Sequence, residues 1–185
     1  MPDEHCIMTN PGERHMSIRD DIINEILDVE GKDFTDDPAD SGGATKWGVT
    51  ERVARYWGYT GQMKYLPRAS AFKILVGEYW TPIKGDALEA LSSMIAREVG
   101  DTAVNCGVHR AAILLQRCLN VLNREGMLYP DLKADGRIGP ATLGALRAYL
   151  SCRSEVTLHK ALNCLQGAHY ITLAESRAVC VRVAG

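Results

Sequence analysis

Apolar residues recur at intervals of three and four along most of this 185-residue chain, and this period limits its fold more than any other feature. The first series comprises Ile18, Ile22, Ile23, Ile26 and Leu27. It predicts a helix from Ser17, a suitable N-cap, to Glu30, with Gly31 as the stop. The same pattern predicts helices over 50–57, 68–79, 87–99, 110–122, 140–150 and 154–175. We therefore expect a mainly α fold with at most a small β-hairpin, near residues 42–50.

Charge and composition exclude several classes of protein. The formal charge is −2 and no basic stretch stands out, so we expect no nucleic-acid partner. No apolar run approaches the roughly 18 residues that span a bilayer. The first residues lack the apolar segment of a signal peptide, so we expect synthesis in the cytoplasm. The chain is expected to be a monomer.

Six cysteines carry no C-x-x-C pair and no zinc-like spacing, so we expect neither a metal nor a cofactor. Free thiols are the leading interpretation of these cysteines, with disulfide or catalytic use as the alternatives.

Glu30 is the first candidate for catalysis. Steps of four from Ile22 through Ile26 place it on the apolar stripe, at the last turn of the helix. Burial and the negative end of the helix dipole both favour a protonated carboxyl there. A general acid for a glycosidic oxygen needs such a proton. The alternative is a carboxylate that points outward or pairs with Lys46.

The loop after Glu30 offers the other groups that a glycosidase uses. Among its carboxylates, Asp36, Asp37 and Asp40 are the candidates. Gly42 and Gly43 allow backbone to approach a sugar, and the Thr45 hydroxyl can orient a water. Each of these residues also has an ordinary role in turns. Aromatic side chains gather between 47 and 80; we expect most in the core and place Trp47, Tyr79 and Trp80 at the substrate.

The stretch "ILDVEGKDFTDDPADSGGATKWGVT" resembles the opening motif of glycoside hydrolase family 108, the N-acetylmuramidases found as phage endolysins and bacterial secretion activators. Lys32 replaces the second glycine of the family's E-G-G, and Val49 replaces isoleucine. The resemblance implies a lysozyme-like fold with Glu30 as the catalytic acid. The spacing of Glu30, Asp40 and Thr45 is also similar to that of the Glu, Asp and Thr around the cleft of phage-type lysozymes. This similarity implies that Asp40 and Thr45 hold the attacking water, with Asp37 as the competitor for that role or as a residue that holds the loop.

A second resemblance covers the C-terminal half. "DTAVNCGVHRAAILLQRCLNVL" and "ADGRIGPATLGAL" are similar to the motifs of the peptidoglycan-binding domain that accompanies this family. It implies that Asn105, Gly107 and Asp135 grip glycan or stem peptide. The alternative is that several of these residues only shape turns. The organisation expected is a leader over 1–16, a muramidase part over 17–100, a binding part over 101–175 and a tail over 176–185.

Together these resemblances imply an N-acetyl-β-D-muramidase that cleaves the β-1,4 bond between N-acetylmuramic acid and N-acetylglucosamine. A non-catalytic wall-binding module and a lytic transglycosylase are the alternatives. The expected partners are peptidoglycan glycan strands and stem peptides. The expected place of action is the periplasm or cell wall, reached through a holin-like pore in phage lysis or in release of a protein or toxin.

Overall fold

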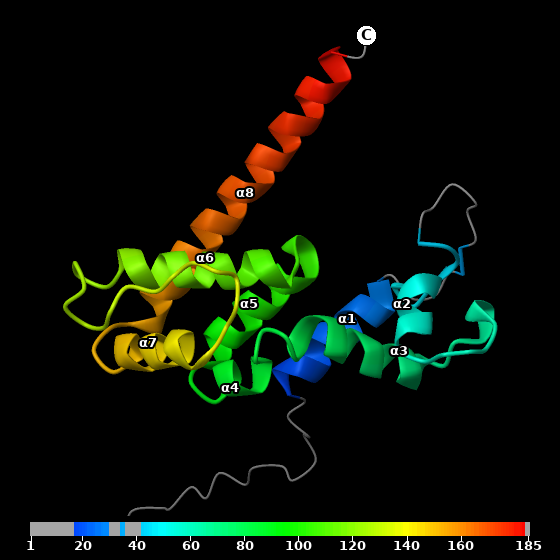
Figure 1. The fold of residues 1–185 in the computed structure, drawn as a ribbon, viewed down its shortest axis with the longest axis horizontal. Helices are drawn as coiled ribbons and strands as arrows, with labels where there is room; N and C mark the ends of the chain where they lie inside the picture. The colour runs from blue at the N-terminus through cyan, green and yellow to red at the C-terminus, as the bar shows by residue number, and fades with distance from the viewer. Residues whose placement is uncertain (1–16, 30–33, 36–41, 184–185) are drawn as a thin grey trace, which may run out of the picture.

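The computed structural model describes residues 17–29, 34–35 and 42–183, with side chains as far as residue 176. This part of the chain contains eight α-helices and one two-stranded sheet (Figure 1). The helices are α1 (Ile18–Val29), α2 (Glu51–Tyr56), α3 (Arg68–Leu75), α4 (Gly85–Glu89), α5 (Ser93–Cys106), α6 (Val108–Val121), α7 (Pro140–Leu150) and α8 (Glu155–Val183). A short turn η1 (Met63–Tyr65) precedes α3, and a wide turn η2 (Val76–Trp80) follows it. The mainly α, lysozyme-like fold is confirmed.

The helix α1 begins as the sequence predicts. The backbone N–H of Asp20 donates to Oγ of Ser17 at 3.3 Å, which caps the first turn. Ile23 and Leu27 face a core shared with the hairpin, α2 and α3, whereas Ile22 faces the larger core formed with α5. One helix therefore joins two apolar clusters.

The predicted hairpin is present and very short. Strand β1 (Thr45–Lys46) pairs antiparallel with β2 (Val49–Thr50), and Thr45 lies opposite Thr50. Its two-residue loop requires positive φ at both positions, and Trp47 and Gly48 have φ of 57° and 68°. Thr50 then caps α2 by accepting a hydrogen bond from the N–H of Val53.

The helix predicted over 87–99 is wrong in one respect, because two helices share this stretch. Ser92 interrupts it, since its Oγ accepts from the N–H of Ile95 and so starts α5. The same hydroxyl donates to Oε2 of Glu155 at 2.6 Å, which ties the start of α5 to the start of α8. At the other end, Gly107 has a φ of 85° and closes α5.

Helix α5 is the centre of the molecule. It packs against α1, α4, α6 and α8, and the sequence-based boundary at residues 100 and 101 falls within it. Helix α8 extends far beyond the body (Figure 1), and Leu158 and Leu162 are its buried side chains in the described part. Among the described residues, none of the helices combines the length and apolarity needed to cross a bilayer.

Candidate functional site

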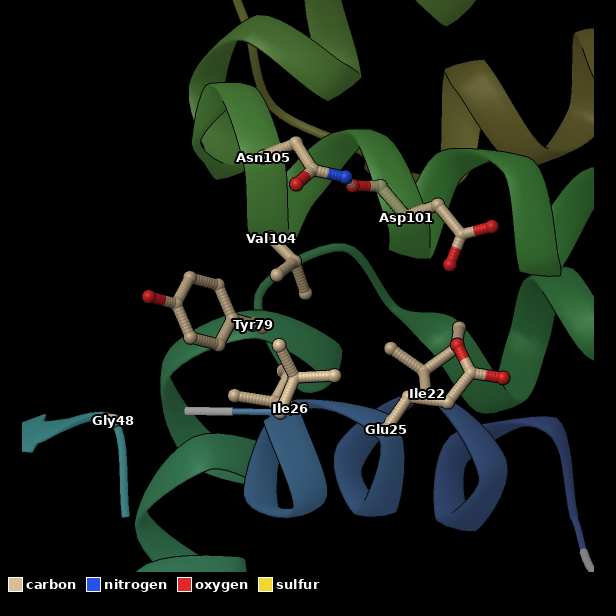
Figure 2. A pocket seen from close by; sticks show the side chains of 9 residues that line it. Ile22, Glu25, Ile26, Gly48, Tyr79, Asp101, Val104 and Asn105 are labelled. Carbon is tan, nitrogen blue, oxygen red and sulfur yellow. Dashed lines mark hydrogen bonds between the residues drawn. The ribbon is translucent and has the colours of Figure 1, made fainter. Parts of the chain in front are cut away.

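A cleft of about 470 Å³ opens between α1, η2 and α5 (Figure 2). Its apolar wall consists of Ile22, Ile26, Val29 and Val104. Its other lining residues are Glu25, Gly48, Tyr79, Asp101 and Asn105. Because α1 ends at Val29, the described wall of the cleft stops one residue before position 30. The apolar stripe of α1 thus runs along the cleft as the helical period requires.

Two acidic side chains approach each other from opposite walls. Figure 2 shows Glu25 rising from α1 and Asp101 reaching toward it from α5. Arg97 joins them, with Nη2 2.5 Å from Oε1 of Glu25 and Nε 4.0 Å from Oδ2 of Asp101. Burial raises the pKa of the Asp101 carboxyl, and the guanidinium of Arg97 opposes that shift. The pKa of the Asp101 carboxyl is therefore higher than that of an exposed aspartate.

Two of the sequence-predicted binding residues line the cleft. Tyr79 lies at one edge of it and Asn105 on the α5 wall (Figure 2). The Asn105 side chain donates from Nδ2 to the backbone oxygen of Asp101 at 2.9 Å, which leaves its carbonyl oxygen for other partners. These positions are compatible with substrate contact.

Thr45 belongs to the hairpin, and Gly42 and Gly43 precede it. None of these three residues lines the cleft. The Thr45 hydroxyl donates to the backbone oxygen of Gly43 at 3.5 Å, and its backbone pairs with that of Thr35. Gly43 has a φ of 73°, a conformation that favours glycine. Gly48, in the loop of the hairpin, lines the cleft, and Thr45 lies three positions before it in the sequence.

Three predicted residues, Glu30, Asp37 and Asp40, lie outside the described residues. The catalytic role of Glu30, and the roles of Asp37 and Asp40 in the loop, stay predictions.

The two tryptophans predicted at the substrate are both anchored elsewhere. Trp47 donates from Nε1 to the backbone oxygen of Leu66 at 2.9 Å and packs on the core beneath the hairpin. Trp80 is 2% exposed, and its Nε1 donates to Oδ1 of Asp86 at 2.7 Å. Trp80 is therefore a core residue, which corrects its assignment to the substrate surface. An indole this large gains more from burial among α1, α4 and α5 than from a place on the wall.

A second hollow, of about 540 Å³, lies in the C-terminal half and contains Asp135. The buried side chain of Gln116 organises it. Its Nε2 donates to Oδ1 of Asp135 and to the backbone oxygen of Arg137, each at 3.0 Å, and its Oε1 accepts from the N–H of Gly136. The hydrogen bond from Gln116 lowers the pKa of Asp135. Asp135 thus shapes its own loop, and Gly107 likewise forms the turn between α5 and α6.

Sequence reasoning missed Glu25 and Asp101. Glu25 stands three residues after Ile22 and four before Val29, so it flanks the apolar stripe of α1. Asp101 stands four residues before Asn105 and shares its helical face. The sequence contains both spacings, but a spacing alone does not predict which face of a helix lines a cleft. In the described part of the chain, no cluster of three His, Cys, Asp or Glu side chains could hold a metal ion.

Comparison with known proteins gives two family matches. Residues 23–107 match the model described as glycosyl hydrolase 108, and residues 110–183 match the one described as a predicted peptidoglycan domain. The change from one to the other falls at the turn between α5 and α6. No curated protein matches the sequence.

Ten solved chains are similar to this one. The structure of SagA from Brucella abortus has a TM-score of 0.59 and 22% sequence identity, with 89% of each chain covered. This similarity supports the fold.

Proposed function

Because this chain belongs to the glycosyl hydrolase 108 family and carries a peptidoglycan domain behind that part, it is a peptidoglycan-degrading glycoside hydrolase, and we propose that it is an N-acetylmuramidase. In this proposal it cleaves the β-1,4 bond between N-acetylmuramic acid and N-acetylglucosamine. The observation that carries the proposal is the cleft along α1, which leads to the position next to Glu30.

Glu30 supplies the proton to the leaving glycosidic oxygen in this mechanism. The sequence puts position 30 one helical turn after Ile26, which lines the cleft, and this supports the assignment. Asp40 stabilises the positive charge that develops on the sugar or, with Thr45, orients the attacking water. Tyr79 and Asn105 hold the glycan in the cleft.

Purified protein incubated with isolated sacculi tests this assignment. We expect release of new reducing ends by the unmodified protein and a loss of about a hundredfold or more for Glu30→Gln, as for removal of a general acid. Glu125→Gln is the matched control, because Glu125 is exposed and lies in a turn of the C-terminal half. Full activity of Glu30→Gln would remove this residue from the mechanism.

Analysis of the products distinguishes a muramidase from a lytic transglycosylase and from a non-catalytic wall-binding module. A muramidase leaves reducing N-acetylmuramic acid ends, whereas a lytic transglycosylase leaves 1,6-anhydro ends, and mass spectrometry distinguishes the two. Binding to sacculi without any cleavage would instead indicate a wall-binding module.

The biological setting is part of the proposal. The enzyme reaches the wall through a holin-like pore during phage lysis, or it opens the wall for release of a protein or toxin. Expression in bacterial cytoplasm with and without a co-expressed pore tests the first route, since lysis should require the pore.

A further inference from the structure

A third hollow shares Asp101 with the cleft and contains charged side chains that the proposed mechanism does not use. It measures about 390 Å³ and lies where the start of α1, the first half of α5 and α8 meet. The residues that matter on its wall are Ser93, Arg97, Glu98, Asp101 and His159. Asp101 lines both this hollow and the cleft, so the two are neighbours along α5.

Glu98 is the unusual residue of this hollow. The residue is only 8% exposed, and its Oε2 lies 3.2 Å from Nε2 of His159. Its Oε1 is buried without a hydrogen-bond partner in the described part of the protein. A buried carboxylate oxygen without a partner costs stability, and a ligand that donates a hydrogen bond would offset the cost. Oε1 is itself buried, so a ligand must displace a neighbouring side chain to reach it, and the His159 imidazole, 36% exposed at its side chain, is one that can move.

Acidic side chains outnumber basic ones around the cleft and this hollow. Three carboxylates, those of Glu25, Glu98 and Asp101, stand against the single guanidinium of Arg97. Arg97 is held by Glu25 at 2.5 Å, and it lies farther from Asp101, at 4.0 Å. These four side chains have an excess of two negative charges, which favours a cationic ligand over an anionic one.

We propose that the hollow at Glu98 binds a primary ammonium group, that of the diamino acid in a peptidoglycan stem peptide that is not cross-linked. The proposal rests on the proposed function, which brings a stem peptide to the cleft. An ammonium group has three donors and one positive charge, so it suits both the unpartnered oxygen of Glu98 and the excess of carboxylates. Cross-linking turns this amine into an amide and removes the charge. The enzyme therefore prefers glycan with free stem peptides.

Acetylation of the substrate tests the preference directly. Sacculi are treated with acetic anhydride, which converts free amines to amides, and reducing ends released from treated and untreated sacculi are compared. The unmodified protein should lose roughly fivefold in kcat/KM on the treated sacculi, the value expected for one partly exposed charge pair. Glu98→Gln should cleave both substrates at similar rates, while Glu125→Gln, which removes a carboxylate outside the hollow, should keep the preference.

A surface variant covers the case in which Glu98→Gln does not fold. Ser93 is exposed on the wall of the hollow, and Ser93→Lys places a competing ammonium there with little risk to the core. It should abolish the preference as Glu98→Gln does. Equal rates of the unmodified protein on both substrates would overturn the proposal and leave the muramidase assignment intact. Release of no reducing ends from either substrate would instead overturn the proposed function.

Soluble probes identify the source of the ammonium group. Calorimetry with the tetrapeptide L-Ala–D-Glu–L-Lys–D-Ala should show binding that is lost in its Nε-acetyl form and weakened by Ser93→Lys. Glucosamine oligomers carry an ammonium group on the sugar instead of the peptide. Binding of these oligomers without binding of the tetrapeptide would overturn the assignment to stem peptides.

Discussion

Oε1 of Glu25 lies 2.5 Å from Nη2 of Arg97, and this ion pair joins α1 to α5 at the edge of the cleft. The side chains are 59% and 41% exposed, respectively, so water and salt screen the pair. The pair therefore positions two walls of the cleft more than it stabilises the fold.

A double-mutant cycle of Glu25→Gln and Arg97→Met measures this pair. We expect a coupling energy of about 0.2–1 kcal/mol in urea unfolding, because exposed pairs contribute little. The coupling should fall further in 1 M salt, where the Debye length is about 3 Å. A coupling above about 2 kcal/mol would show that the pair is far better shielded from water than its exposure indicates.

Asp101→Asn should change how stability depends on pH. The folded-state pKa of Asp101 lies above its ordinary value of 3.8, so the folded protein binds this proton more tightly than the unfolded chain. The unfolding free energy therefore falls as pH rises from 3.8 through the folded-state pKa, and above that window the loss is complete. We expect the Asn variant to be more stable than the unmodified protein at pH 7.

Thermal unfolding across pH provides the measurement. The additional stability of Asp101→Asn over the unmodified protein should shrink as the pH is lowered. It should disappear below pH 3.8, where both proteins carry an uncharged side chain at this position. Glu125→Gln should show no such trend. A gain that is constant with pH would point to a cause other than the proton.

Much of this fold could be predicted because local rules and packing agree. The caps Ser17 and Thr50 and the helix start at Pro140 are determined by the nearest turn of chain, and the structure has all three. The break at Ser92 was missed because the apolar period continues across it. The Ser92 hydroxyl caps α5 locally, and its hydrogen bond to Glu155, 63 residues away, adds a contact that no local pattern contains.

The candidate site was harder to predict from the sequence, because contacts between distant parts of the chain form it. Tyr79 was identified among the aromatic side chains and Asn105 from a motif, and both line the cleft. Trp80 directly follows Tyr79 but points into the core, because neighbouring positions of a turn face different sides. Asp101 required knowledge of which face of α5 meets α1, and this depends on contacts between helices that no local pattern contains.

Gly85 should tolerate no side chain. A Cβ there would lie 2.1 Å from Cε2 of Trp80, whose ring is buried and cannot move aside. Gly85→Ala should therefore cost about 1–3 kcal/mol of unfolding free energy, as overpacking does. Gly144 lies within α7 and has nothing within 4 Å of the same position, so Gly144→Ala should stabilise by about 0.5–1 kcal/mol. Urea unfolding compares the two, and an equal effect of both would contradict the packing around Trp80.

A comparison of Gly136 with Gly126 distinguishes the cost of backbone strain from the cost of a steric conflict. It has a φ of 73°, and an added Cβ would lie 2.0 Å from Nδ1 of His109. Gly126 has a φ of 83° with nothing within 4 Å, so Gly126→Ala should cost only the strain, about 1–2 kcal/mol. Gly136→Ala should cost about 1 kcal/mol more than that, because the His109 ring must be displaced.

The second substitution His109→Ala tests the steric part of this cost. His109 is exposed, so its removal alone should change stability by less than about 0.5 kcal/mol. In the Gly136→Ala background, His109→Ala should restore the additional unfolding free energy that Gly136→Ala loses relative to Gly126→Ala. The remaining loss should then equal that of Gly126→Ala. A double variant as unstable as Gly136→Ala would place the conflict in the backbone of the loop that Gln116 holds, and not at the imidazole.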